Sequence, residues 1–183
     1  DEAIDPRVVC ELIRQWSTFH PEFAYLPRKF KIAVVATEED RAAIEVHDVG
    51  IRIKKHVIHG LAFDLWVGGG LGRTPLLGHR LLADLPLDEL RNWLTAVLRV
   101  YNLAGRRDNK YKARIKILVN AMGVEAFREA VTHRYLTDHD SDLKISAETL
   151  EDLGNSFSHN LEPQPIEGPQ GSTDFQRWYL QNT

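Results

Sequence analysis

Cysteine and long apolar runs are the two features that this sequence most clearly lacks. Its 183 residues include a single cysteine, Cys10, so an internal disulfide is excluded. No apolar stretch approaches the roughly 20 residues that a membrane-spanning helix needs. The net charge of −3 gives no general attraction to nucleic acid. We therefore expect a cytoplasmic protein that has neither a membrane nor a nucleic acid as its partner.

The common signatures of metal and nucleotide sites are missing too. The histidines are scattered without H-E-x-x-H or H-x3-H spacing, and no G-x-S-x-G marks a serine nucleophile. A phosphate-binding G-x-x-x-x-G-K-[ST] loop is absent as well. Zinc enzymes and P-loop nucleotidases are therefore not predicted, and we expect no residue of this chain to bind a metal.

The most informative segment present is LPRKFKIAV, residues 26–34, which is typical of a β-strand. Side chains alternate along a strand, so Lys29 and Lys31 share one face while Phe30 lies on the apolar face. Two ammonium groups about 7 Å apart can bind one small, doubly charged anion from the same side. The plainer interpretation is a half-buried strand whose lysines are simply solvated.

A glycine run follows the apolar residues 61–66. In VGGGLGRTP, residues 67–75, Gly68, Gly69 and Gly70 remove every Cβ where the chain leaves a predicted strand. Backbone without side chains can approach a flat ligand closely or take positive φ. Tight turns also use such runs, so the pattern alone does not establish a ligand site.

A basic cluster lies in GRRDNKYKARIKILV, residues 105–119. We predict a helix from Asn109 to Asn120, with Arg107, Lys110 and Arg114 on one face. This face suits carboxylates or phosphates, for which arginine provides a two-point contact. A solvated basic face and a nucleic-acid patch are the alternatives.

Together these segments resemble the sirohaem-dependent nitrite and sulfite reductases, most closely the assimilatory sulfite reductase haemoprotein (beta) subunit. The similar blocks occur in the family's order and cover about the first three quarters of the chain. They are HPEFAYLPRKFKIAV, DRAAIEVHDVGI (residues 40–51), VGGGLGRTP, RVYNLAGRRDNKYKARIKILV (residues 99–119) and GVEAFREAV (residues 123–131).

The resemblance implies specific roles for these residues. Lys29 and Lys31 match two lysines that face the sirohaem iron, bind the anionic substrate and deliver protons. Arg28 and Arg114 match basic residues near the carboxylates of sirohaem. Gly68, Gly69 and Gly70 match a glycine run against the macrocycle. The implied reaction is the six-electron reduction of sulfite to sulfide at sirohaem coupled to a 4Fe-4S cluster.

Several alternatives stay open at this point. The parent could be a nitrite reductase, although Lys31 favours the more highly charged sulfite. The electron donor could be ferredoxin or an NADPH-flavoprotein. The family's cluster needs four cysteines, and this chain has one. We therefore interpret it as a fragment that is inactive alone, the alternative being a non-catalytic module that binds a tetrapyrrole or a partner.

The expected fold is α+β, a mixed β-sheet flanked by helices. We predict a sirohaem-binding domain over residues 1–135 and a polar linker over 136–174 that could hold a short helix. Residues 175–183, which include Phe175 and Trp178, are predicted to start a following ferredoxin-like half. We predict strands at residues 30–36, 47–54 and 61–67 and a strong helix at residues 87–103.

Overall fold

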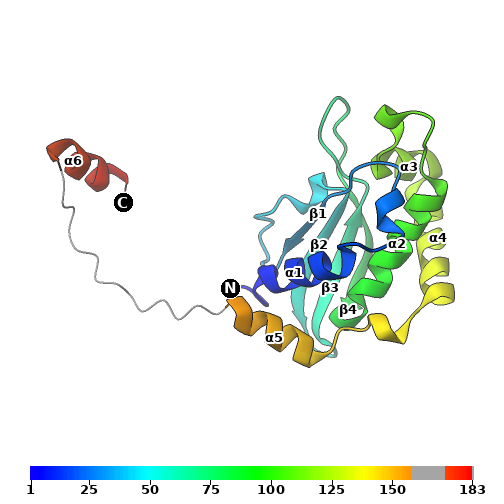
Figure 1. Cartoon of the computed structure of the whole chain (residues 1–183), viewed down its shortest axis with the longest axis horizontal. Coiled ribbons are helices and arrows are strands. Elements are labelled where there is room, and N and C mark those ends of the chain that lie inside the picture. The colour runs from blue at the N-terminus through cyan, green and yellow to red at the C-terminus, as the bar shows by residue number, and fades with distance from the viewer. Residues whose placement is uncertain (158–171, 183) are drawn as a thin grey trace.

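The computed structural model describes residues 1–157 and 172–182 and contains one mixed sheet. The strands are β1 (Ile32–Val35), β2 (Val49–His56), β3 (Gly60–Val67) and β4 (His79–Pro86), in the order β1-β2-β3-β4. β1 pairs with β2 in parallel, whereas β2–β3 and β3–β4 are antiparallel (Figure 1). The expected α+β class with a mixed sheet is confirmed.

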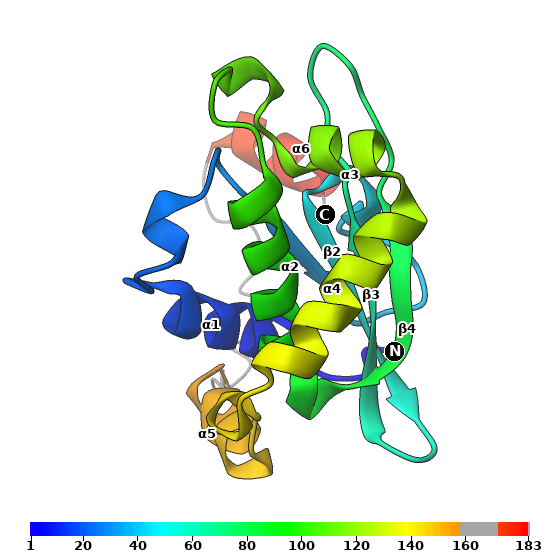
Figure 2. The same cartoon turned by 90° about the vertical axis from the view of Figure 1, so that its right-hand side faces the viewer.

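Helices cover one face of this sheet. They include α1 (Pro6–Ser17), α2 (Leu90–Ala104), α3 (Ile115–Met122) and α4 (Val124–Asp138). Two further helices, α5 (Ala147–Phe157) and α6 (Thr173–Asn182), follow them in the chain. Figure 2 shows α2 and α4 lying across the front of β2 and β3. α1 begins with Pro6, and the Asp5 side chain before it accepts the free backbone N–H of Arg7.

The alternation of the central strands explains how the core forms. Ile51 and Ile53 on β2 and Phe63 and Leu65 on β3 are almost fully buried against the helices. Between them, Arg52 and Lys54 lie on the other face. Burying an aliphatic or aromatic side chain of this size stabilises a fold by about 1.5–3 kcal/mol. The apolar face therefore fixes the register of β2 against β3.

β1 is shorter than the sequence predicts. It begins at Ile32, so Lys29 and Lys31 precede the strand rather than belong to it. The backbone N–H of Lys31 donates to the Asp48 carboxylate instead of to a neighbouring strand. The ring of Phe30, between the two lysines, packs 5.7 Å from that of Tyr101 on α2.

The predicted helix from Asn109 to Asn120 is wrong in its first half. A 3-10 turn covers Lys110–Lys112, and α3 starts only at Ile115, after an extended Arg114. The Ala113 carbonyl accepts the Tyr101 hydroxyl at 2.8 Å, which holds this segment in an irregular conformation. Arg107 and Arg114 therefore do not share a helix face.

β4 was not expected, because its sequence does not alternate. HRLLADLP carries two register shifts against β3 and a left-handed residue, Asp84, at φ 57°. Asp84 and the buried Asp64 both contact the Lys54 ammonium, at 2.8 and 2.7 Å. Tertiary pairing with β3, rather than local pattern, makes this segment a strand.

The C-terminal region differs in detail from the predicted boundaries. α4 continues past residue 135 to Asp138, and α5 lies inside the predicted linker, where Phe157 stacks under the Arg7 guanidinium. Residues 158–171 of that linker lie outside the described residues. The side chains of α6 are almost all exposed in the structure, and Figure 1 draws this helix apart from the sheet. Its assignment to a following ferredoxin-like half stays a prediction.

The backbone around Gly69, directly after β3, is packed so closely that a side chain has no space there. A Cβ at this position would lie 2.2 Å from the Glu45 carbonyl oxygen, closer than any real contact. We expect Gly69→Ala to lower the free energy of unfolding by about 2 kcal/mol or more, because backbone must move. Gly154→Ala is the matched control: it meets no atom within 4 Å inside α5 and should stabilise by about 0.5–1 kcal/mol. Urea denaturation of both variants measures this.

Candidate anion-binding site

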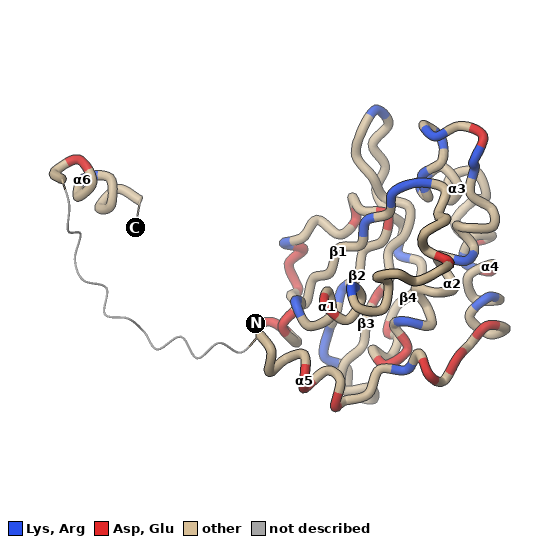
Figure 3. The backbone as a smooth tube through the Cα atoms, in the orientation of Figure 1, with Lys and Arg blue, Asp and Glu red and all other residues tan. Residues whose placement is uncertain are grey.

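A cavity of about 830 Å³ opens where β1 begins, beside the loop after β3 and the start of α3. Every charged side chain that lines it is a lysine or an arginine. The lining residues are Arg28, Lys29, Leu71, Gly72, Arg73, Thr74, Arg106, Lys110, Tyr111, Lys112, Arg114, Lys116 and Ile117. Figure 3 shows lysine and arginine gathered at this end of the molecule. Such a concentration of cations attracts anions and suits carboxylates or phosphates.

Asp48 lies behind this cavity, with a fully buried side chain directly before β2. Its Oδ1 accepts Nε and Nη2 of Arg114 at 3.1 and 2.8 Å. Its Oδ2 accepts the backbone N–H of Lys31 at 3.0 Å. The Asp48 backbone carbonyl accepts the N–H of Gly68, also at 3.0 Å. One residue therefore joins the lysine segment, the glycine run and the start of α3.

Lys116 is the second buried polar group of the site. Its Nζ donates to the carbonyl oxygens of Gly70, at 3.3 Å, and of Thr74. Burial and the neighbouring Arg114 cation lower the pKa of the Lys116 ammonium, while the Asp48 carboxylate opposes the shift. These contacts fasten the loop after β3 to α3 and define one wall of the cavity.

The glycines act beneath the cavity rather than at its surface. Gly68 has φ +91°, and Gly69 lies against the Glu45 and His47 carbonyls. A Cβ on Gly70 would lie 3.0 Å from Nη2 of Arg114. None of Gly68, Gly69 and Gly70 is among the lining residues. Their observed effect is to let neighbouring backbone and the Arg114 side chain come close.

The predicted binding residues are partly brought together. Arg28, Lys29 and Arg114 line the cavity, whereas Lys31 is exposed and is not among its lining residues. Arg107 does not line it either: its guanidinium donates to the Tyr25 carbonyl at 2.8 Å and ties residues 105–107 to the segment before β1. The basic cluster therefore divides between ligand-facing and structural roles.

Sequence reasoning missed Asp48 and Lys116. Asp48 directly precedes the buried residues Val49, Gly50 and Ile51 of β2. A carboxylate at such a position is buried and needs a cation or a hydrogen-bond donor beside it. Lys116 belongs to the basic cluster of residues 105–119, for which the sequence gives a solvated or anion-binding face, although Lys116 lies between two apolar residues, Ile115 and Ile117. Arg73, at the tip of the glycine-rich loop, gave no signal of its own.

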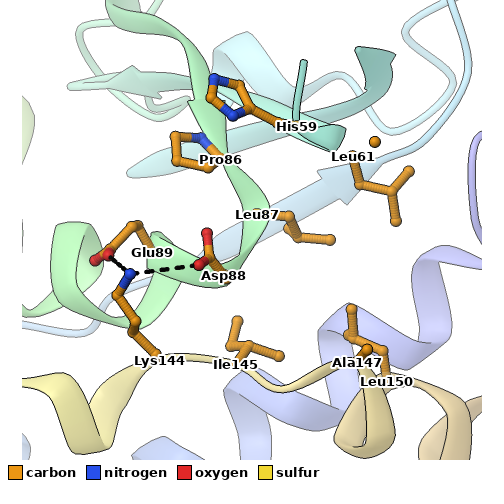
Figure 4. A pocket seen from close by; sticks show the side chains of 11 residues that line it. His59, Leu61, Pro86, Leu87, Asp88, Glu89, Lys144, Ile145, Ala147 and Leu150 are labelled. Carbon is orange, nitrogen blue, oxygen red and sulfur yellow. Dashed lines mark ion pairs between the residues drawn. The ribbon is translucent and has the colours of Figure 1, made fainter. Parts of the chain in front are cut away.

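A second cavity, of about 530 Å³, lies between the start of β3, the end of β4 and α5. Figure 4 shows Lys144 pointing to Asp88 and Glu89, at 3.6 and 2.8 Å. Apolar side chains, including Leu87 and Ile145, cover its other walls. Because the charges pair with one another, this cavity has no excess of positive charge and is not a candidate anion site.

A cluster with four thiolate ligands does not fit the described residues. Cys10, the one cysteine, is exposed on α1. Within residues 1–157 and 172–182, no group of three or more His, Cys, Asp or Glu side chains could hold a metal ion. No helix in the same ranges is both long and apolar enough to cross a bilayer.

The Glu89 contacts predict a pH dependence of stability. Burial alone would raise the pKa of Glu89, but hydrogen bonds from Lys144, His139 and Asn92 outweigh it and hold the pKa below 4.5. A carboxyl whose pKa is lowered in the folded state stabilises fully above its ordinary pKa. This contribution is lost as the pH falls from about 4.5 through the lower folded value. Glu89→Gln should lack that part of the acid transition, whereas Glu148→Gln, at an exposed position of α5, should retain it. Unfolding midpoints between pH 6 and 3 measure the difference.

Two arginines of the same cavity predict different stability effects. Arg114→Met would leave Asp48 buried without its guanidinium, and we expect a loss of about 3 kcal/mol in the free energy of unfolding. Arg106 pairs with Asp108 at the surface, where both side chains are about half exposed or more. Arg106→Met should therefore cause no measurable change. Equal effects of the two substitutions in urea denaturation would contradict this assignment.

Comparison with known proteins identifies the family. The family model described as "Nitrite and sulphite reductase 4Fe-4S domain" matches residues 1–139. "Sulfite reductase [ferredoxin] 1" of Mycolicibacterium paratuberculosis is 42% identical over 136 residues, which are 74% of this chain and 24% of that protein. "Ferredoxin--nitrite reductase" of Synechococcus elongatus is 33% identical over 116 residues, 62% of this chain and 22% of that protein.

The fold has a solved counterpart. The "Structure of Mycobacterium tuberculosis NirA protein" aligns with a TM-score of 0.65 at 38% identity, covering 74% of this chain and 24% of that chain. The chain spans about a quarter of the length of the relatives it matches. With the mixed sheet, the cationic cavity and the match over residues 1–139, this chain belongs to the nitrite and sulphite reductase family.

Proposed function

We propose that this chain is the sirohaem-binding part of a sulfite reductase, and that its cationic cavity receives the acidic tetrapyrrole and the substrate anion. The single observation that carries the proposal is the composition of the cavity wall: all of its charged side chains are cations, and Arg28 and Lys29 are among them. Membership of the family supplies the chemistry that such a wall serves.

The cavity suits a polycarboxylate. Sirohaem carries eight carboxylates, and several lysines and arginines are needed to replace the water that these groups lose on binding. Lys29, Arg73 and Lys110 come from three separate segments of the chain, so their charges can meet carboxylates around the edge of a flat ligand. The residues present therefore fit the prosthetic group that the family implies.

Lys29 and Lys31 are proposed to bind the anion and to deliver protons. Phe30 between them packs toward Tyr101 on α2. Lys29 lines the cavity, whereas Lys31 is exposed outside its lining. An ammonium group beside a bound oxyanion stabilises negative charge as it develops. Lysine can also lose its proton more readily than arginine, because its pKa responds to nearby cations and to desolvation. Bound sirohaem would supply the electron-transfer chemistry of the reduction.

The cluster chemistry is not assigned to this chain, because Cys10 alone cannot hold four irons. The six-electron reduction of sulfite to sulfide is accordingly proposed for a parent protein with further segments. Sulfite is preferred to nitrite because two lysines suit the more highly charged anion. The names of the relatives include both substrates, and they name ferredoxin and NADPH as donors.

A second candidate is a non-catalytic module that binds a tetrapyrrole or a partner without reducing anything. The lone cysteine favours it, whereas the intact cationic wall favours a site that still holds the prosthetic group. If the chain binds sirohaem but no added partner protein restores sulfite reduction, the non-catalytic module is supported. Binding of RNA or DNA with steep salt dependence would instead support a nucleic-acid role.

Titration of the purified chain with sirohaem tests the proposal. We expect a shifted Soret band, saturation at one equivalent, and an affinity that falls with increasing salt. Lys29→Ala should weaken binding about tenfold, the value of one charge-assisted hydrogen bond. Lys55→Ala removes an exposed lysine from β2, outside the cavity, and should leave the affinity unchanged. Equal affinity of the wild type and Lys29→Ala would contradict the role of Lys29.

A further inference from the structure

We propose that Asp48 is the positioning residue of the cationic cavity, and that it acts on the bound polycarboxylate through Arg114. The inference deepens the proposed function and rests on it. Asp48 does not line the cavity, but its carboxylate contacts two of the segments that do: the Arg28–Lys31 segment and the residue before α3.

Contacts with Asp48 fix the direction of the Arg114 guanidinium. Arg114 is extended and precedes the first turn of α3, so no helix fixes its side chain. Two of its donors, on Nε and Nη2, converge on one oxygen of Asp48. Its third nitrogen, Nη1, lies 3.5 Å from the Leu71 carbonyl, which is only a weak contact. The donors of Nη1 therefore remain available to a ligand in the cavity.

Burial makes this orientation firm. The Asp48 side chain is 0% exposed and that of Arg114 is 19% exposed. A buried carboxylate without its cation is costly, so the guanidinium cannot leave without a large loss of stability. The absence of a Cβ on Gly70 leaves space for the guanidinium, since that atom would lie 3.0 Å from Nη2.

The Asp48 carboxylate and the Arg114 guanidinium neutralise each other's charge. Because Asp48 compensates the charge of Arg114, this arginine contributes directed hydrogen bonds rather than net attraction. Attraction comes from cations such as Lys29 and Arg73, for which the described residues contain no acidic partner within ion-pair distance. A ligand carboxylate would therefore be drawn in by these cations and oriented by a guanidinium that is already fixed, which reduces the entropy lost on binding.

The other oxygen of Asp48 extends the effect to the predicted catalytic segment. It accepts the Lys31 N–H, and the Lys31 carbonyl accepts Val49 N–H at 3.1 Å. The backbone that carries Lys29 and Lys31 is thus held at two points beside the same carboxylate. Loss of Asp48 would release Arg114 and loosen this segment together.

A double-mutant cycle tests the proposal on the full chain with sirohaem as the probe. We expect Asp48→Asn to weaken binding about tenfold when Arg114 is present, and less than twofold in the Arg114→Met background. Arg114→Lys keeps the charge but loses the two-point contact, so it should weaken binding as much as Asp48→Asn. Asp64→Asn is the matched control: it removes a buried, lysine-paired carboxylate outside the cavity and should leave the affinity unchanged.

The cycle separates an effect through Arg114 from an effect on the fold alone. A tenfold loss from Asp48→Asn in both the wild-type and the Arg114→Met backgrounds would overturn the proposal, as would unchanged binding by Arg114→Lys. If Asp48→Asn does not fold, Arg114→Lys carries the test by itself.

The NMR signal of the Arg114 Nε–H provides a readout without ligand. It should be protected from exchange in the wild type and exchange faster in Asp48→Asn, because the neutral amide oxygen is a weaker acceptor for this proton than the carboxylate. If the wild-type chain does not bind sirohaem, the proposed function fails, while this signal still decides whether Asp48 orients Arg114.

Discussion

The buried ion pair between Asp48 and Arg114 is the interaction on which the rest of the site depends. Its carboxylate is removed from water and must be neutralised where it lies, so the guanidinium has essentially one stable position. The same residue accepts backbone N–H groups from Lys31 and Gly68. Three segments that are far apart in the sequence therefore meet at one point behind the cavity.

The cavity is built mainly from loops that a rigid sheet and helices support. Its walls come from the residues before β1, the loop after β3 and the irregular segment before α3. Loops can place many cations around one space, which regular elements with fixed side-chain directions cannot do as freely. Lys116 and the glycine run keep this loop arrangement compact, because the ammonium binds loop carbonyls and the missing side chains allow close packing.

Family membership and chain length have to be considered together. Residues 1–139 match the family model, yet the described residues offer a single exposed thiol and no other set of metal ligands. The cationic wall depends on local packing around Asp48 within this chain. A four-iron cluster depends on thiolates that this chain does not contain, which is why its reaction is proposed only for a longer parent.

The sequence by itself determined what local periodicity and composition control. The alternation of β2, the apolar run of β3 and the apolar stripe of α2 were readable, because burial selects the residues at these positions. The blocks around Lys29 and Gly68 also identified the family. Only tertiary structure decided that Lys31 and Arg107 lie outside the cavity lining, where α3 begins, and that β4 is a strand. These depend on partners distant in the chain, such as Tyr101 for Ala113 and β3 for β4. Asp48 shows the difference most clearly: its type and position are visible in the sequence, but its role exists only because folding brings Arg114 within 2.8 Å.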